Sequence, residues 1–194
     1  MNRISVLLIL CLCNTSIFAQ YDLNLDFEST TRHSASGPLM PANWDAGNDE
    51  FSGYPEGEGY KVYLDSLERH SGKFSLKMEM SGVRKINSFG VFISSLPIDI
   101  FADKNVELRG WIKTKNVKNG FAGLWIRVIG ADRSMLGFDN MHDRGLSGDN
   151  NWTQVSIKMT ISKDAEYIYF GGIFPGEGVV WFDNLELFIN GVKY

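Results

Sequence analysis

The stretch "VELRGWIKT", residues 106–114, has the alternation of a β-strand that is buried on one side. Leu108 and Ile112 fall on one face of such a strand, and Arg109 and Trp111 fall on the other. Successive side chains of a strand point to opposite faces, so the apolar set predicts a core face and the second set an outward face. The same period of two runs through two more stretches, "KFSLKMEM" (73–80) and "QVSIKMTI" (154–161).

Working outward from these stretches, further short strands alternate with turn motifs such as "VKNG" and "PGEG". Residues 30–59 are the least regular part and are predicted to be a long surface excursion. About nine short strands separated by glycine-rich turns predict an all-β fold, a jelly-roll β-sandwich of two antiparallel sheets. We expect one domain over residues 20–194. The further strands are predicted at residues 21–27, 60–65, 89–94, 121–129, 167–174 and 179–188.

The start of the chain has the pattern of a secretory signal peptide over residues 1–19. Arg3 gives a positive start, residues 4–13 are an apolar run, and Ala19 offers a small-residue cleavage point. The run is well short of the ~20 residues that span a bilayer, so no membrane span is predicted. The mature protein is therefore expected to be exported, to the periplasm, the cell surface or the medium.

Composition excludes several function classes. The two cysteines, Cys11 and Cys13, leave with the signal, so we expect no disulfide, thiol nucleophile or thiolate metal site. The formal net charge is −4, which argues against binding to nucleic acid. Three histidines at no ligand spacing argue against zinc. No nucleophile-elbow motif is present, and nothing selects a pair of catalytic carboxylates, so an enzyme is the minority interpretation.

Several motifs follow one another along the mature chain: "NLDFE" (24–28), "NW" (43–44), "HSGKFSLKM" (70–78), "LRGWIKT" (108–114), "NNWTQVSIKMTI" (150–161) and "VVWFDNLEL" (179–187). In this order they resemble the galactose-binding-like jelly-roll domains. The resemblance is strongest to the carbohydrate-binding modules attached to xylanases and cellulases, and it covers nearly the whole mature chain. It implies a non-catalytic module that binds carbohydrate. The central part also resembles accessory domains of secreted and regulatory bacterial proteins.

Two separate observations lead us to expect a structural calcium ion. Asn24, Asp26 and Glu28 alternate with apolar residues in "YDLNLDFE", and such oxygen-bearing side chains suit Ca²⁺. The resemblance implies that calcium ties the first strand to the last, with the carboxylates of Glu28 and Asp183 as ligands. It further implies main-chain oxygens of the "HSGK" turn as ligands, near His70 and Lys73. The alternative is an ordinary polar strand face with a turn aspartate.

Aromatic and arginine residues predict where a ligand binds. Trp125 and Arg127 lie opposite an aliphatic face in "AGLWIRVIG" (122–130), as Arg109 and Trp111 do in theirs. If the two strands are neighbours, one sheet presents all four outward, and sugar rings favour such a platform with planar donors around it. The alternative is that loops or a partner cover this face. The loop at 139–144 is expected to close one end of the platform as a clamp or brace, through Asp139, Asn140 and Arg144.

Three functions therefore remain open from the sequence. The first is an exported carbohydrate-binding module. The second is a structural or interaction module that presents this face to a protein partner, which a contiguous apolar patch would favour. The third is a small jelly-roll glycoside hydrolase or lyase, which carboxylates facing each other across a groove would favour.

Overall fold

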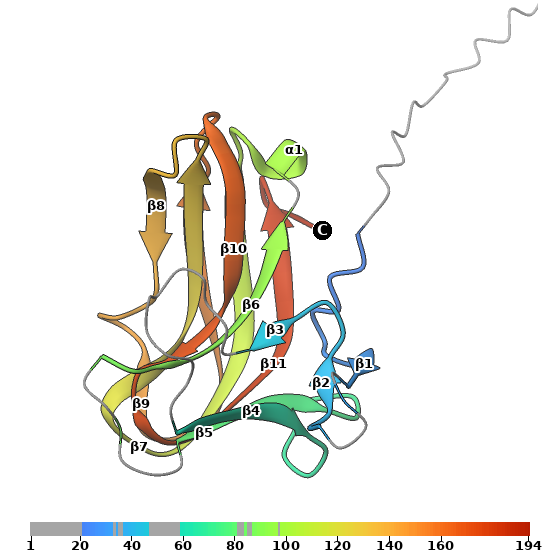
Figure 1. Ribbon diagram of the computed structural model, residues 1–194, viewed down its shortest axis with the longest axis vertical. Helices are drawn as coiled ribbons and strands as arrows, with labels where there is room; N and C mark the ends of the chain where they lie inside the picture. The colour runs from blue at the N-terminus through green and yellow to red at the C-terminus, as the bar shows by residue number, and fades with distance from the viewer. Residues whose placement is uncertain are drawn as a thin grey trace, which may run out of the picture.

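The computed structural model of the protein describes residues 21–32, 34, 37–46, 59–80, 84, 87–96 and 98–194. The predicted signal peptide lies outside the described residues. The predicted fold class is confirmed: the described chain is nearly all β, with antiparallel sheets curled into a barrel-like sandwich (Figure 1). None of the helices in this part of the chain is long and apolar enough to cross a membrane.

The elements follow one another along the chain as twelve strands and one short helix in the described residues. They are β1 (Thr30–Thr31), β2 (Met40–Pro41), β3 (Asp45–Ala46), β4 (Tyr60–Asp65), β5 (Ser75–Met80), β6 (Gly90–Leu96), α1 (Ile98–Phe101), β7 (Asn105–Gly130), β8 (Met135–Asp139), β9 (Leu146–Thr160), β10 (Ala165–Phe174), β11 (Glu177–Ile189) and β12 (Val192–Lys193).

Strand β7 runs through both layers of the sandwich. Its first half pairs with β9 and β11, and its second half pairs with β8 and β10. The β10 layer is the row β3-β6-β10-β7-β8, and Figure 1 shows β6, β10, the second half of β7 and β8 side by side. The β11 layer is the row β4-β5-β11-β7-β9. The sequence predicted two separate strands here, because the "VKNG" motif suggested a turn between them; the chain continues instead, with irregular pairing around that motif.

The predicted strand at residues 21–27 is wrong. Asn24 and Phe27 have positive φ angles of 48° and 62°, outside the range of a regular strand, and the Phe27 N–H donates to the Asn24 carbonyl in a turn. This turn lets Leu23 and Phe27 both enter the core. The amide of Asn24 is buried and bonds the backbone of Ser29 and Ala42. The predicted oxygen-lined strand face of Asn24, Asp26 and Glu28 therefore does not form.

The predicted surface excursion at residues 30–59 is wrong for its described middle part. Strand β3 pairs with β6, and the side chains of Met40 and Trp44 are 3% and 2% exposed. The Trp44 indole N–H donates to the carbonyls of Leu23 and Asn24, at 3.1 Å each. Trp44 therefore joins the first residues of the domain to its core. Residues 47–58 lie outside the described residues.

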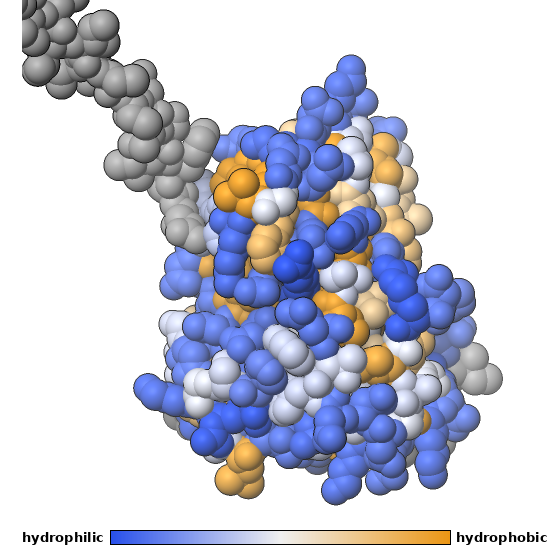
Figure 2. All heavy atoms as spheres, turned by 180° about the vertical axis from the view of Figure 1, so that it is seen from behind, coloured by the Kyte–Doolittle hydropathy of each residue, from blue (hydrophilic) through white to orange (hydrophobic). Residues whose placement is uncertain are grey.

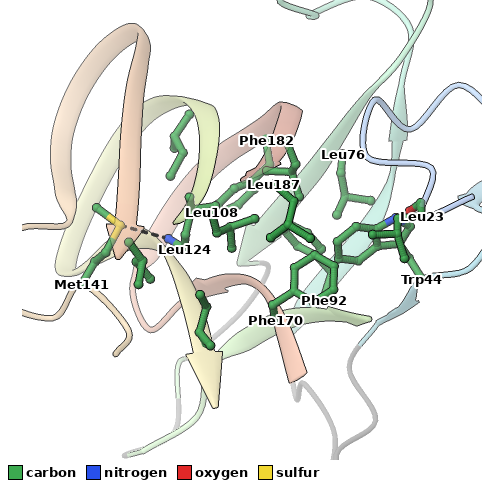
Figure 3. Packing of buried hydrophobic residues seen from close by; sticks show 14 of the residues in the cluster. Leu23, Trp44, Leu76, Phe92, Leu108, Leu124, Met141, Phe170, Phe182 and Leu187 are labelled. Atoms are coloured by element: carbon green, nitrogen blue, oxygen red, sulfur yellow. Dashed lines mark hydrogen bonds between the residues drawn. The ribbon is translucent and has the colours of Figure 1, made fainter. Parts of the chain in front are cut away.

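The core lies between the two layers, and its centre is aromatic (Figure 3). Trp44 meets both Phe92 and Phe170 edge to face at centroid distances of 5.2 Å, and Phe182 approaches Phe92 at 5.0 Å from the other layer. Such edge-to-face pairs add to the free energy gained by burial. Of the residues that alternation placed inward, Phe74, Met80, Val155 and Met159 are only partly buried at the margin. The others are buried: Leu76, Met78, Val106, Leu108, Ile112, Leu124, Ile126, Val128, Ile157 and Ile161.

Candidate ligand-binding faces

The structure separates the four residues that were expected to form one platform. Trp111 lies in the β11 layer, in register with Gln154 of β9 and Asp183 of β11. Trp125 lies in the β10 layer, opposite Gly171. The aliphatic residues beside each tryptophan face the same core from its two sides, so the two tryptophans lie on opposite outer faces of the sandwich. The predicted single surface is wrong, because the two strand segments are successive halves of β7 rather than neighbours.

Trp125 is part of the packing of its layer. Its side chain is 8% exposed, and its indole N–H donates to the Phe92 carbonyl at 3.4 Å. The ring thus crosses Gly171 on β10 to reach β6. A Cβ atom at Gly171 would lie 2.0 Å from the Phe92 carbonyl oxygen, so the backbones approach closely where the indole crosses. Trp125 therefore cannot serve as the open platform predicted for it.

The outer face of the β10 layer carries a different aromatic set, called the β10 face below. Phe138, Arg127, Tyr169 and Ser95 stand in one row across four strands by register. Tyr167, next to this row on β10, is 50% exposed, and Phe138 is 47% exposed. The rings of Tyr167 and Tyr169 are nearly parallel, with centroids 6.4 Å apart. Since neighbouring strands are ~4.8 Å apart, the row spans roughly 14 Å.

Sequence reasoning overlooked Tyr167 and Tyr169 as candidate ligand residues. The signal was present in "EYIYF", where both tyrosines alternate with Ile168 and Phe170. The strand was recognised from this stretch, but its outward residues were not combined with those of the 122–130 stretch, because strand order across a sheet is not written in either one.

The loop after β8 is internally braced. The Arg144 guanidinium bonds Asp139 at 2.6 Å and Asp143 at 3.0 Å. The second Asp139 oxygen accepts the N–H of Met141, and the Asn140 side-chain oxygen accepts the N–H of His142. Burial opposes ionisation of Asp139, but the Arg144 hydrogen bond, the Met141 N–H and the Arg144 charge outweigh it and lower the pKa of Asp139.

This brace has a structural purpose. Met141 has a positive φ of 60° and a side chain that is 2% exposed, and its sulfur lies 3.3 Å from the Leu124 N–H (Figure 3). The Asx turns and Arg144 hold the loop backbone in place, so that the Met141 side chain packs into the core beside β7.

The outer face of the β11 layer, called the β11 face below, interleaves aromatic rings with cations. His70 stacks on Trp111 with centroids 4.1 Å apart and 15° between the planes, and Trp152 meets His70 edge-on at 5.7 Å. Arg109 lies 4.1 Å over the Phe188 ring and forms two hydrogen bonds with Glu107. Arg109 is thus held in place within the sheet surface. His70 was considered in the sequence only for its main chain, so its ring is a further residue that sequence reasoning missed.

A groove of about 780 Å³ opens beside Trp111 on this face. The segment at the start of the domain forms one wall and is fixed to the last strands, because the Leu185 N–H donates to the Leu25 carbonyl at 2.8 Å. Figure 2, taken from behind the view of Figure 1, shows a mostly hydrophilic surface with hydrophobic groups between. The groove is lined by Tyr21, Asp22, Leu23, Asn24, Leu25, Asp26, Trp111, Gln154, Asn184, Leu185, Glu186, Lys193 and Tyr194.

The residues predicted for calcium meet at the "HSGK" turn. Glu28 Oε1 accepts the N–H groups of Lys73 and Phe74, at 2.7 and 3.1 Å. Asp183 Oδ2 accepts the N–H groups of His70 and Ser71, at 2.7 and 3.0 Å. Both carboxylates therefore lie at one turn, as binding of a shared cation would require. In this structure the turn contacts them through backbone N–H groups.

The environment of Asp183 is unusual for a carboxylate. The residue is fully buried, and burial raises its pKa, against the opposing effect of the backbone N–H groups of Ser71, His70 and Asn184. Across the described ranges, no group of three or more histidine, cysteine, aspartate or glutamate side chains could hold a metal ion. Calcium bound by Glu28, Asp183 and main-chain oxygens of the turn stays a prediction.

Comparisons with known proteins place the fold. No family model matches the chain. An uncharacterised HTH-type transcriptional regulator of Bacillus subtilis (strain 168), YbfP, is 32% identical over 126 residues, which are 65% of this chain and 42% of that protein. The match thus spans less than half of the length of that regulator.

Solved carbohydrate-binding modules share the architecture. The CBM22-1 xylan-binding domain of Paenibacillus barcinonensis Xyn10C is similar at a TM-score of 0.54 and 13% identity, over 84% of this chain and 90% of that one. The C-terminal family 22 module of Clostridium thermocellum Xyn10B gives a TM-score of 0.54 and 12% identity, over 89% and 98%. At such identities the likeness shows the fold alone. This chain therefore has the jelly-roll fold that these solved carbohydrate-binding modules share.

Proposed function

We propose that this protein is an exported, non-catalytic carbohydrate-binding module whose ligand lies across the β10 face. The observation that carries the proposal is the row of Phe138, Arg127 and Tyr169 across three strands, with Tyr167 beside it. The similar folds of xylan-binding domains support the class of ligand.

The chemistry of this face suits a sugar chain. A pyranose or furanose ring has apolar C–H faces and hydroxyl edges, so it stacks on exposed tyrosine or phenylalanine rings while its hydroxyls bond planar donors. Arg127 supplies such donors between two aromatic positions. Trp125, on the same side of the layer, links β7 to β6 through its hydrogen bond to the Phe92 carbonyl, and a face held in this way loses little entropy on binding.

The test is calorimetric titration with xylohexaose of the wild type and the variants Tyr167→Ala and Tyr169→Ala. Each variant is expected to weaken binding by ~10-fold or more, because aromatic residues dominate many binding free energies. The matched control is Tyr63→Ala on the opposite face, which should bind as the wild type does. Normal binding by both β10-face variants would contradict the proposal.

A protein partner is the second candidate, and one observation favours it. Three exposed apolar residues gather on β8, with Tyr167 close by on β10: Met135 is 59% exposed, Leu136 41% and Phe138 47%. Strand β8 lies at the end of its layer, and contiguous apolar surface beside a strand edge often marks an interface. Absence of binding to xylohexaose, together with self-association or capture of a partner that Phe138→Ser abolishes, would favour this candidate over the first.

A further inference from the structure

We infer that the groove beside Trp111 is a second binding site, for a single neutral sugar ring. It lies on the β11 face, across the sandwich from the site proposed above, and it shares no residue with that site. The inference rests on three features of the groove: a fixed indole ring, flanking amide side chains, and an acidic lining.

The indole of Trp111 is held in one orientation. His70 stacks on one face of the ring at 4.1 Å, and His70 is not among the residues that line the groove. The groove therefore meets the part of the indole that His70 leaves uncovered. Because the ring is already fixed by this stack, a ligand that packs against it loses little side-chain entropy on binding.

Amide side chains flank the indole on the two neighbouring strands. Gln154 is directly opposite Trp111 on β9, and Asn184 follows the residue opposite Trp111 on β11. The Asn184 amide nitrogen lies 3.2 Å from His70 Nδ1, which fixes the orientation of that side chain. An amide both donates and accepts hydrogen bonds, as a sugar hydroxyl does, so the pair suits the edge of a ring that packs on the indole.

The charge of the lining selects among polar ligands. Asp22, Asp26 and Glu186 line the groove together with one cation, Lys193, which is paired with Glu186 at 2.6 Å. The unbalanced carboxylates repel phosphates, sulfates and uronic acids. They accept hydrogen bonds from hydroxyl groups, so a neutral sugar fits this lining and an anionic one does not.

One oxygen of each groove carboxylate is already hydrogen-bonded within the chain. Asp22 accepts the N–H of Asn24, Asp26 accepts the N–H of Glu28, and Glu186 accepts a hydrogen bond from the Lys193 ammonium group. Hydrolysis of a glycosidic bond needs one carboxyl group that stays protonated and a second that is ionised, facing each other across the sugar. The groove carboxylates thus serve as hydrogen-bond acceptors, and we infer binding of the sugar without cleavage of a glycosidic bond.

The experiment is ¹⁹F NMR of the whole protein labelled with 5-fluorotryptophan. The chain has five tryptophans, so five resonances are expected, and Trp111 and Trp125 report on the two faces separately. Xylohexaose, cellohexaose and mannohexaose are added in turn up to about 10 mM, because a site for one ring is expected to bind with a Kd near the millimolar range. Oligogalacturonate is the anionic comparison.

The expected result is a saturable shift of the Trp111 resonance with at least one neutral probe and none with oligogalacturonate. Gln154→Ala should weaken this binding by ~2- to 10-fold, the effect of one hydrogen bond. Asn151→Ala is the matched control, an exposed amide on the same strand that does not line the groove. The shift should persist in the double variant Tyr167→Ala, Tyr169→Ala, which separates this site from the β10 face.

Three outcomes would overturn the inference. The Trp111 resonance could stay unmoved by all three neutral probes, or it could respond equally to oligogalacturonate. It could also lose its response in the β10-face double variant, which would show that both faces report one site. Chromatography of the probes after titration completes the test, since shortened products would identify a hydrolase instead of a binding site.

Discussion

Trp111 and Trp125 lie on the same strand with the same alternation around them, yet the two layers use them differently. Trp125 is 8% exposed, and from its position opposite Gly171 on β10 its indole bonds the Phe92 carbonyl on β6. Trp111 is half-buried at the surface and stacked by His70, with a groove beside it. An outward position in a strand therefore does not by itself expose a side chain to solvent. The residues on the adjacent strands determine how much of the side chain is exposed.

The largest expected effect tests whether the two layers hold their tryptophans differently. Trp125→Ala should destabilise the protein by ~3–5 kcal/mol, because it removes a nearly buried indole from a rigid layer. Trp111→Ala should cost less, ~1–2 kcal/mol, mainly through the lost stack with His70. Urea unfolding of both variants, followed by circular dichroism, gives the two free energies of unfolding. Equal losses would mean that the two layers hold their tryptophans alike.

The calcium hypothesis sharpens the comparison, since Glu28 and Asp183 meet at the turn between β4 and β5 of the β11 layer. If Ca²⁺ binds only the folded protein, ~100-fold excess over its Kd should add ~2.7 kcal/mol to stability. The measurement is thermal unfolding in excess calcium chloride and in a chelator.

Glu28→Gln serves as the control for this prediction, because it removes a carboxylate while it leaves a side chain that can still accept the N–H groups of Lys73 and Phe74. The calcium-dependent rise in Tm should disappear in this variant. Identical melting of the wild type under both conditions would count against the site.

Much of the fold could be predicted from the sequence, and the site could be predicted only in part. Alternation identifies a strand and its two faces, which is why Leu108, Ile112, Leu124 and Ile126 were placed in the core correctly. Alternation carries no information on which strands are neighbours. The platform prediction treated two segments of one strand as neighbouring strands. The opening strand was predicted wrongly, because alternation does not reveal the positive φ of Asn24, where the chain turns.

A smaller effect, in pH dependence, distinguishes Asp183 from the surface carboxylates. Burial raises the folded-state pKa of Asp183 above its ordinary value, so the folded protein holds this proton more tightly than the unfolded chain. Its contribution is therefore most favourable below the ordinary pKa and is lost as pH rises through the folded-state value. We expect the stability of the wild type relative to Asp183→Asn to fall as the pH rises above the ordinary pKa of an aspartate. Urea unfolding at several pH values measures it, and a constant difference would contradict the assignment.

The smallest expected effect concerns Arg144, in the loop that follows the apolar edge strand of the β10 layer. Its guanidinium is 43% exposed, and solvent screens its pairs with Asp139 and Asp143, so Arg144→Ala should cost no more than ~1 kcal/mol. The sign of the pH dependence is opposite to that of Asp183. Because the pKa of Asp139 is lowered in the folded protein, the stability that Arg144 supplies is present above the ordinary pKa of an aspartate and is lost as pH falls through the lowered value. The difference in unfolding free energy between wild type and Arg144→Ala should therefore shrink on acidification, while the difference for Asp183→Asn changes in the other direction. If both differences moved the same way, the two carboxylates would share one environment, and the contrast between the braced loop and the buried turn would fail.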